Sequence, residues 1–593
     1  MTPTVSFYFS IAVLCVVLSC LTVRPHHVCR CRPGDQCWPS AMDWMTLNNS
    51  VDGNLIAVRP IAHVCHHPTF DENACGNLTR LARNSGWRAG QPGALQDWLW
   101  EVGSTERETC DTQGRPDEPC HQGRVSLYSV TARSALHVQR AVAFAKHHDL
   151  RLVIRNTGHD GSGRSSAPDS LQIFTHYLDA IQYDEDFRPV DSPRAIGPAV
   201  SVGAGVRLGD MYTRASREGY TIVGGLCPTV GIAGGFVQGG GVSAIFSHTR
   251  GLAVDNTLEF EVVTADAKQI IVNEHRHQDL FWALKGGGGG TFAVVTRLTV
   301  RKYPDGPAVF PQVTASSRAL NGLLPAHVMV ALLRALRSYN EAGIAGEVLV
   351  HSHPTTAVLK LYVLDTTDAV EINGRLDPLV MDLQAEDVVV DRSWQVYENV
   401  SSAPRMSSDI YSPEYGIIQG SVLLSEDFFK SPAWDDRLAD SLASIHLQPD
   451  DMIFINTLGG QVNAHGPLVD TSVHPSWRNS AQLVNILRHV EPTLESRTFV
   501  TQILTRVQMP ILYSLDRSDP VSYLNMGDPY EPRAPTVYWG QNYRRLSKIK
   551  RKWDESSLFI TRLGVGSEMW DEDGMCRREF GLMHRLYRFF LSG

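Results

Sequence analysis

The chain has 593 residues, of which 43% are hydrophobic and 20% are charged. This composition is typical of a folded protein with several domain-sized units, and it excludes a wholly disordered, collagenous or multi-span membrane protein. The chain carries 54 lysine and arginine residues against 63 aspartate and glutamate residues, a net charge of −9. Because nucleic-acid phosphates are bound by basic surfaces, we do not expect a nucleic-acid-binding protein.

Residues 1–23 predict a secretory signal peptide. Val5–Val23 is almost continuously apolar, and the first charged residue is Arg24, a pattern that is typical of a signal core. No lysine or arginine precedes the apolar run, and its length nearly spans a bilayer, so a retained membrane anchor and a buried helix are the alternatives. We expect the rest of the chain to be secreted or to lie in the secretory-pathway lumen, without stable membrane association unless this segment is retained.

The cysteines agree with this compartment. Of the eleven cysteines, two lie in the predicted signal and seven of the other nine precede residue 121, which favours disulfides formed in an oxidising environment. Nine is odd, and Cys227 stands apart from the cluster, so it is the expected leftover thiol. Zinc binding at Cys29 and Cys31 is the rival interpretation, but no Cys/His pair follows at finger spacing, and we expect no metal. Acceptor triplets at Asn48, Asn77 and Asn399 indicate a glycoprotein.

The sequence changes character after residue 120. Residues 24–120 are rich in cysteine, proline and glycine and predict a disulfide-linked, loop-rich lead-in. Residues 121–304 alternate helical and strand patterns and predict a folded domain. Its expected elements are a helix around Ala135–Ala145 and strands at Arg151–Arg155, Leu258–Thr264, Gln269–Asn273 and Phe292–Tyr303.

Pro304, Gly306 and Pro307 mark the start of a second unit, 305–525, which we expect to be α+β. Residues 526–593 are too short and too polar to fold alone, and we expect them to pack back on the earlier domain. The expected elements of the second unit are helices at Pro325–Gly343 and Arg497–Leu515 and strands at Glu347–Ser352, Ala357–Val363 and Ile417–Leu424.

Four glycine-rich sites lie within the first domain. They are Arg155–Ser165, Gly203–Gly209, Gly224–Gly241 and Gly286–Gly290. Glycine lets backbone N–H groups converge on an anion such as a pyrophosphate, and so many glycines weaken regular structure unless a large ligand lies against the backbone. Plain turns are the alternative, as is a nicotinamide-type dinucleotide site at Gly203–Gly209, whose glycine spacing differs from the fingerprint by one residue.

The motifs around these glycines resemble one family of flavoproteins. This family is the vanillyl-alcohol-oxidase superfamily. Its berberine-bridge-enzyme-like branch is the most similar, in particular the fungal isoamyl-alcohol-oxidase-like and FAD-linked oxidoreductases of that branch. The similarity runs from Cys29 to Trp570. The motifs that carry it are Thr157–Asp160 with Gly163–Ser165, Cys227–Gly231, Gly239–Gly241, Gly286–Thr291, Tyr538–Leu546 and Gly564–Trp570.

This resemblance implies a fold and a cofactor. The fold is α+β: a PCMH-type FAD-binding domain of two subdomains at 121–304, a substrate-binding domain at 305–525 with an antiparallel sheet covered by helices, and a C-terminal segment at 526–593 that completes the flavin site. FAD would be bicovalently attached through His159 and Cys227, leaving eight cysteines for four disulfides. A solvated loop histidine and a buried or disulfide-bonded thiol are the alternatives. The further expected cofactor contacts are Asn156, Thr157, Gly158, Asp160, Gly161, Gly163, Ser165, Gly231, Gly235, Gly240, Gly241, Asn542 and Tyr543.

The family also implies a catalytic base, Tyr523, in a Tyr-x-Asn pattern. A phenol titrates near 10, so its deprotonation needs assistance. By resemblance, Gln461 or Asn463 on a facing strand would donate a hydrogen bond to Tyr523. An ordinary core tyrosine is the alternative.

The expected function follows from the resemblance. The protein would be an FAD-dependent oxidoreductase of secondary metabolism that transfers hydride from an alcohol, or from an activated C–H, of a small organic molecule to the flavin, with molecular oxygen as acceptor and hydrogen peroxide as product. The alternatives are an oxidative cyclase or dehydrogenase of a specialised metabolite and a flavin-binding protein without turnover. We expect a monomer.

Overall fold

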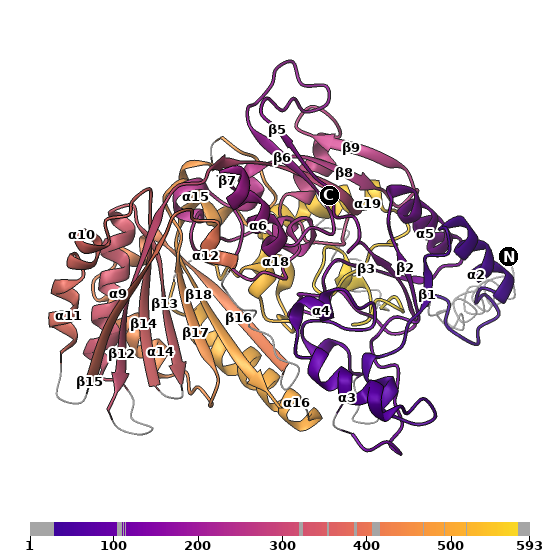
Figure 1. Cartoon of the computed structure of the whole chain (residues 1–593), viewed down its shortest axis with the longest axis horizontal. Helices are drawn as coiled ribbons and strands as arrows, with labels where there is room; N and C mark the ends of the chain where they lie inside the picture. Colours follow the sequence, from indigo (N-terminus) through magenta and orange to yellow (C-terminus); the bar gives the residue numbers. More distant parts are fainter. Residues whose placement is uncertain are drawn as a thin grey trace, which may run out of the picture.

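The computed structural model describes residues 29–103, 109–110, 112, 114–318, 324–352, 355–384, 388–405, 416–466, 468–491, 493–516 and 519–578 (Figure 1). The predicted signal, with Cys15 and Cys20, lies outside these residues. Within the described ranges, no helix combines the length and the apolar character needed to cross a bilayer. The fold is α+β, as predicted.

The first sheet carries the glycine-rich loop that contains His159 and that follows the last residue of strand β3 (Arg151–Arg155). Its order is β1 (Leu55–Ala57), β2 (Tyr128–Thr131), β4 (Ser170–Phe174) and β3 (Arg151–Arg155). Strands β2, β4 and β3 are parallel, and β3 has the predicted bounds. The predicted helix is α5 (Ala135–His147), in which Val138, Ala141, Val142 and Ala145 recur every three or four residues and are buried. The Ser134 hydroxyl accepts from the His137 N–H and caps the helix.

The second sheet is antiparallel and lies beside the first (Figure 1). Its order is β5 (Ile181–Asp184), β6 (Ala199–Gly203), β10 (Val294–Arg301), β8 (Thr257–Val263) and β9 (Gln269–Asn273). The predicted strands at 258–264 and 269–273 are therefore confirmed. The strand predicted at 292–303 is shorter, and its end forms a separate two-stranded pair, β11 (Tyr303–Pro304) with β7 (Tyr220–Thr221). Helices α6 (Leu208–Glu218), α7 (Ser247–Arg250) and α8 (Gln278–Leu284) connect these strands.

The second unit is built on one seven-stranded antiparallel sheet. Its order is β15 (Val388–Tyr397), β12 (Ala308–Ser317), β14 (Thr355–Leu364), β13 (Ala345–Ser352), β17 (Met452–Thr457), β18 (Ser480–Val490) and β16 (Gly416–Ser425). The three strands predicted here are confirmed as β13, β14 and β16.

Helices cover one face of this sheet. They are α9 (Ala326–Glu341), α10 (Ala369–Gly374), α11 (Asp377–Leu383), α13 (Glu426–Phe429), α14 (Trp434–Ala443), α16 (Leu494–Ile503) and α17 (Met509–Tyr513). The helix predicted over 497–515 is thus split into two α-helices by one π-helical turn, Leu504–Gln508. Side chains alternate across a strand, so Val348, Ile455 and Val484 pack under these helices while their sequence neighbours face the other way.

The N-terminal segment is more helical than the sequence predicts. It contains α2 (Ala41–Ser50), α3 (Glu72–Leu81) and α4 (Ser85–Ala89). These helices are short, and side-chain caps from Ser40, Asp71 and Asn84 begin them.

Four disulfides join eight of the cysteines, the predicted number. The pairs are Cys29–Cys576, Cys31–Cys37, Cys65–Cys75 and Cys110–Cys120. The first pair links the lead-in to the C-terminal segment. That segment carries α18 (Ala534–Trp539) and α19 (Asn542–Trp553) and lies among elements of the first domain (Figure 1). The buried Lys550 donates to the Thr291 carbonyl and fixes α19 there.

Candidate active site

A cavity of about 560 Å³ is lined by the glycine-rich loops of the first domain and by side chains from the open face of the seven-stranded sheet. Eleven of the predicted site residues line it. They are Asn156, Thr157, Gly158, His159, Asp160, Gly161, Ser165, Cys227, Gly231, Gly235 and Tyr523. The positions come from both halves of the chain, so the fold brings together most of what the sequence singled out.

The loop after β3 is shaped by Asp160. Its carboxylate accepts hydrogen bonds from the backbone N–H groups of Ser162, at 3.0 Å, and Ser165, at 2.7 Å. Gly158 and Gly163 have φ of +74° and +68°, a backbone conformation that favours glycine. A side chain at Gly163 would lie 2.2 Å from the Trp100 ring, so this glycine is needed for packing against Trp100, and it does not line the cavity.

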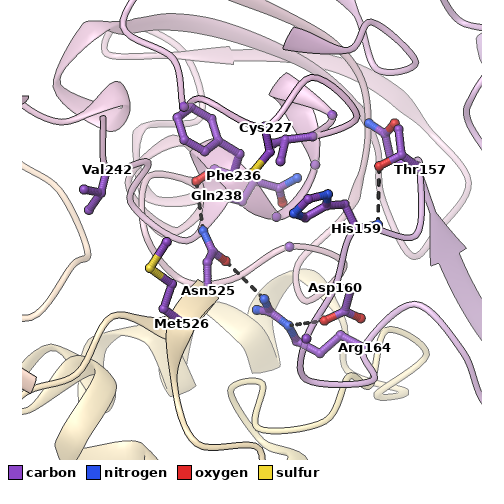
Figure 2. Close-up of a pocket in the computed structure, with 18 of the residues that line it drawn as sticks. Thr157, His159, Asp160, Arg164, Cys227, Phe236, Gln238, Val242, Asn525 and Met526 are labelled. Atoms are coloured by element: carbon purple, nitrogen blue, oxygen red, sulfur yellow. Dashed lines mark hydrogen bonds and ion pairs between the residues drawn. The ribbon is translucent and has the colours of Figure 1, made fainter. Parts of the chain in front are cut away.

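His159 and Cys227 belong to two different glycine-rich loops and line the same cavity (Figure 2). His159 Nδ1 lies 3.0 Å from the Thr229 hydroxyl oxygen, which orients the imidazole. Cys227 is half-buried and takes part in none of the four disulfides. A nitrogen and a sulfur nucleophile therefore face one cavity from two directions.

The cavity wall fits a large group that carries N–H donors. Asn156 Oδ1 and Gln238 Oε1 are buried acceptors without a hydrogen-bond partner in the described structure, and such atoms normally have one. Asn156 donates through Nδ2 to the Ala204 carbonyl, and this bond fixes the orientation of the side-chain amide. Its Oδ1 therefore remains available as an acceptor. A Cβ at Gly231 would lie 2.5 Å from the Asn156 side chain, so only glycine lets the two loops approach this closely.

Tyr523 is 2% exposed and meets a chain of polar groups. The Asn525 Nδ2 donates to its hydroxyl oxygen at 2.8 Å, and the Val242 N–H donates at 3.3 Å. Arg164 donates to Asn525 Oδ1 at 3.1 Å (Figure 2). The guanidinium thus sets which end of the amide faces the phenol.

These contacts act on the pKa of Tyr523 in opposite directions. The pKa of the phenol lies above its usual value, because burial, which disfavours the charged phenolate, is the largest effect. The hydrogen bonds from Asn525 and from the Val242 and Gly241 N–H groups, with the positive charge of Arg164, lower the pKa. All of these groups stabilise the phenolate relative to the phenol.

Gln461 and Asn463 do not contact Tyr523, so the predicted hydrogen bond is wrong. Both residues lie in α15 (Gln461–Ala464), beyond the end of β17. Gly459 and Gly460, at φ of +69° and +48°, turn the chain out of the strand. Asn463 instead donates to the Ser480 carbonyl at 3.0 Å and accepts from its N–H at 3.1 Å. The Tyr-x-Asn pattern itself contained the actual partner, Asn525.

Four more predicted residues lie outside the cavity lining. Gly240 packs behind the Tyr523 ring, where a Cβ would lie 3.6 Å from it, and Gly241 would place a Cβ 2.3 Å from that of Ala253. Asn542 donates to the Val473 carbonyl, and the Tyr543 hydroxyl accepts from the Gly566 N–H. These four residues pack or form hydrogen bonds behind the cavity lining, and none of them is part of the cavity surface.

Sequence reasoning missed the polar wall opposite the loops. Glu347, Asn456, Asn485 and Gln419 come from four strands of the seven-stranded sheet and line the cavity. A charged residue in an otherwise apolar strand, Glu347 before Val348, is the signal that could have found it.

Within the described residues, one cluster has donor atoms close enough to hold a metal ion: Cys31, Asp35 and Cys37. Cys31 and Cys37 are joined in a disulfide, so their thiolates are not available as ligands.

Comparisons of sequence and of structure with known proteins indicate one family. Residues 127–273 match the family of FAD binding domains, and residues 522–566 match the family described as berberine and berberine like. The FAD-linked oxidoreductase easE of Arthroderma otae is 46% identical over 580 residues, covering 96% of this chain and 95% of the relative. The VAO-type flavoprotein MtVAO615 of Myceliophthora thermophila is 29% identical with a TM-score of 0.82, covering 93% of this chain and 100% of that structure.

A more distant structure shares the fold. The glucooligosaccharide oxidase of Acremonium strictum, which carries a 6-S-cysteinyl, 8α-N1-histidyl FAD, is 17% identical with a TM-score of 0.57 and covers 79% of this chain and 94% of its own. Three observations support one conclusion: the 46% identity to an FAD-linked oxidoreductase over nearly the full length, the two family matches, and the geometry of the loops. This chain belongs to the FAD-linked oxidoreductases of the vanillyl-alcohol-oxidase type, in the berberine-bridge-enzyme-like branch.

Proposed function

We propose that this protein holds FAD through bonds to both His159 and Cys227 and oxidises a small organic molecule at a C–H beside a hydroxyl or heteroatom. The flavin, when bound, supplies a two-electron acceptor for hydride. The observation that carries the proposal is that an imidazole and a thiol from two glycine-rich loops line one cavity. The related glucooligosaccharide oxidase, with its histidyl and cysteinyl FAD, supports the same attachment here.

The loops supply the remaining contacts to the cofactor. Asn156 and Gln238 offer buried acceptor atoms to N–H donors of the group. The backbone of the Gly158–Ser165 loop, which Asp160 holds in shape, offers N–H groups suited to a pyrophosphate. The Thr229 hydroxyl lies 3.0 Å from His159 Nδ1 and positions the ring for attachment.

Tyr523 is the proposed base. It would accept the hydroxyl proton of the substrate as the C–H bond breaks, which requires a phenolate or a phenol that is easily ionised. Asn525 donates to the phenol oxygen, and Arg164 fixes the Asn525 amide in that orientation. We propose this pair in place of Gln461 and Asn463.

Replacing Arg164 by Gln should move the pH profile of flavin reduction by about one pH unit to higher pH. The Arg164 charge lowers the pKa of Tyr523, so its loss raises that pKa, and the deprotonated form then requires more alkaline solution. The rate at neutral pH falls, while the rate at high pH recovers. Stopped-flow reduction across pH measures both. Arg276→Gln, which removes an exposed arginine paired with Asp191, is the control, and an Arg164→Gln profile that overlays the control would contradict this role.

Oxygen is the proposed electron acceptor, with hydrogen peroxide as product, in secondary metabolism. The test is to mix the purified yellow protein with a panel of primary alcohols, secondary alcohols and amines. We expect at least one class to bleach the flavin without oxygen and to give steady peroxide in air. Bleaching without peroxide would make the protein a dehydrogenase or cyclase, and no bleaching by any C–H donor would leave only a flavin-binding role.

We further propose that the protein matures in the secretory pathway as a monomer. Four disulfides support an oxidising compartment. Asn77, in an acceptor triplet, is exposed on α3 and accessible to glycosylation.

A further inference from the structure

The open face of the seven-stranded sheet places one carboxyl group in the cavity wall. Because side chains alternate along a strand, Val348 packs under the helices while Glu347 and Leu349 face the cavity. Phe454 and Asn456 on β17 face it in the same way. Glu347 and Asn456 are register partners on neighbouring strands, as are Leu349 and Phe454. In this part of the cavity wall, the polar pair Glu347 and Asn456 therefore lies next to the apolar pair Leu349 and Phe454.

Glu347 is 6% exposed, and both of its carboxylate oxygens accept from neutral donors. The Tyr362 hydroxyl donates to Oε1, and Asn456 Nδ2 donates to Oε2 at 2.9 Å. A carboxylate offers about four acceptor positions, so about two are left over. Burial raises the pKa of this carboxyl, since removing a charge from water is unfavourable unless a partner compensates for it.

The nearest cation does not neutralise Glu347. Lys360 on β14 is its register partner, but the ammonium lies over the rings of Phe310 and Tyr362, 5.9 and 5.6 Å from their centroids. No ion pair joins Glu347 to a cation in the parts of the chain that are described. The other two charged side chains of the lining, Asp160 and Arg164, lie 3.8 Å apart and balance each other.

We propose that Glu347 binds a protonated amine of the substrate, with Leu349 and Phe454 against the apolar carbons beside that nitrogen. This inference rests on the proposed function, because it assigns the substrate class of the same cavity. A neutral donor would fill an acceptor position and leave the buried charge uncompensated. An ammonium group fills an acceptor position with a hydrogen bond, and its positive charge also stabilises the ionised carboxylate in its buried position.

The test uses the yellow holoenzyme and three probes of one shape: N-methyl-2-phenylethylamine, which is cationic, 2-phenylethyl methyl ether, which is neutral, and 3-phenylpropanoate, which is anionic. Isothermal titration calorimetry gives each Kd. We expect the amine to bind at least about tenfold more tightly than the ether, and the anion to bind most weakly. Equal binding of amine and ether by the wild-type protein would overturn the proposal without any variant.

Glu347→Gln keeps the side-chain shape and removes the charge. It should weaken amine binding about tenfold and leave ether binding unchanged, while Asp391→Asn, an exposed change on β15 of the same sheet, should alter neither. A Glu347→Gln protein that keeps the amine preference would overturn the proposal. A yellow protein that lacks the preference contradicts this inference alone, whereas a colourless protein contradicts the proposed function.

Discussion

Replacing Tyr523 by Phe should slow flavin reduction by about 10²- to 10⁴-fold, the usual contribution of a positioned general base. The variant loses only the hydroxyl to which Asn525 and Val242 donate. The ring keeps its edge-on contact with Trp477, with centroids 5.7 Å apart. Flavin content should therefore stay close to that of the wild-type protein, and thermal stability should fall modestly because two donors lose an acceptor. Stopped-flow mixing without oxygen measures the rate.

Tyr538→Phe is the matched control. Tyr538 is also buried and donates to the Asp528 carbonyl at 3.0 Å, but it does not line the cavity. We expect this variant to lose some stability and to reduce its flavin at an unchanged rate. If Tyr523→Phe reduces its flavin as fast as Tyr538→Phe does, Tyr523 is an ordinary core tyrosine.

Removing both proposed attachment residues, His159 and Cys227, should release the flavin completely on denaturation. Each single variant, His159→Ala or Cys227→Ala, keeps one covalent bond, so its flavin should stay with the acid-precipitated protein. Each should also show a changed reduction potential, since the protein environment tunes the cofactor. The double variant holds FAD by noncovalent contacts alone, so all of the colour should pass to the supernatant.

The exposed His147 in α5 gives a control, because His147→Ala should retain flavin as the wild-type protein does. Complete release from His159→Ala alone would remove Cys227 from the account. Retention by the double variant would mean that another side chain carries the bond.

Local patterns predicted the regular elements well. Arg151–Arg155 and Gln269–Asn273 have the predicted bounds, because short apolar runs between turn residues can fold in few ways. The N-terminal helices were missed because they are short and lie in a segment whose cysteine, proline and glycine content indicated loops. The π-helical turn at Leu504–Gln508 leaves no mark on apolar periodicity.

The site was predicted where its residues lie in contiguous motifs. His159 and Cys227 stand in such motifs, and both line the cavity. Gln461 and Asn463 were assigned to a strand, but two glycines at positive φ end that strand before them. Glu347 lies beside Asn456 in the cavity wall through the pairing of β13 with β17, two strands that are far apart in the sequence, and such pairing cannot be read from one segment.

The most direct test of the account is acid precipitation of the pure wild-type protein, followed by proteolysis and mass mapping of the yellow peptides. We expect the flavin to stay in the pellet and to be found on a cross-linked pair of peptides, one containing His159 and the other Cys227. A colourless pellet, or flavin found on peptides that contain neither residue, would contradict the central claim.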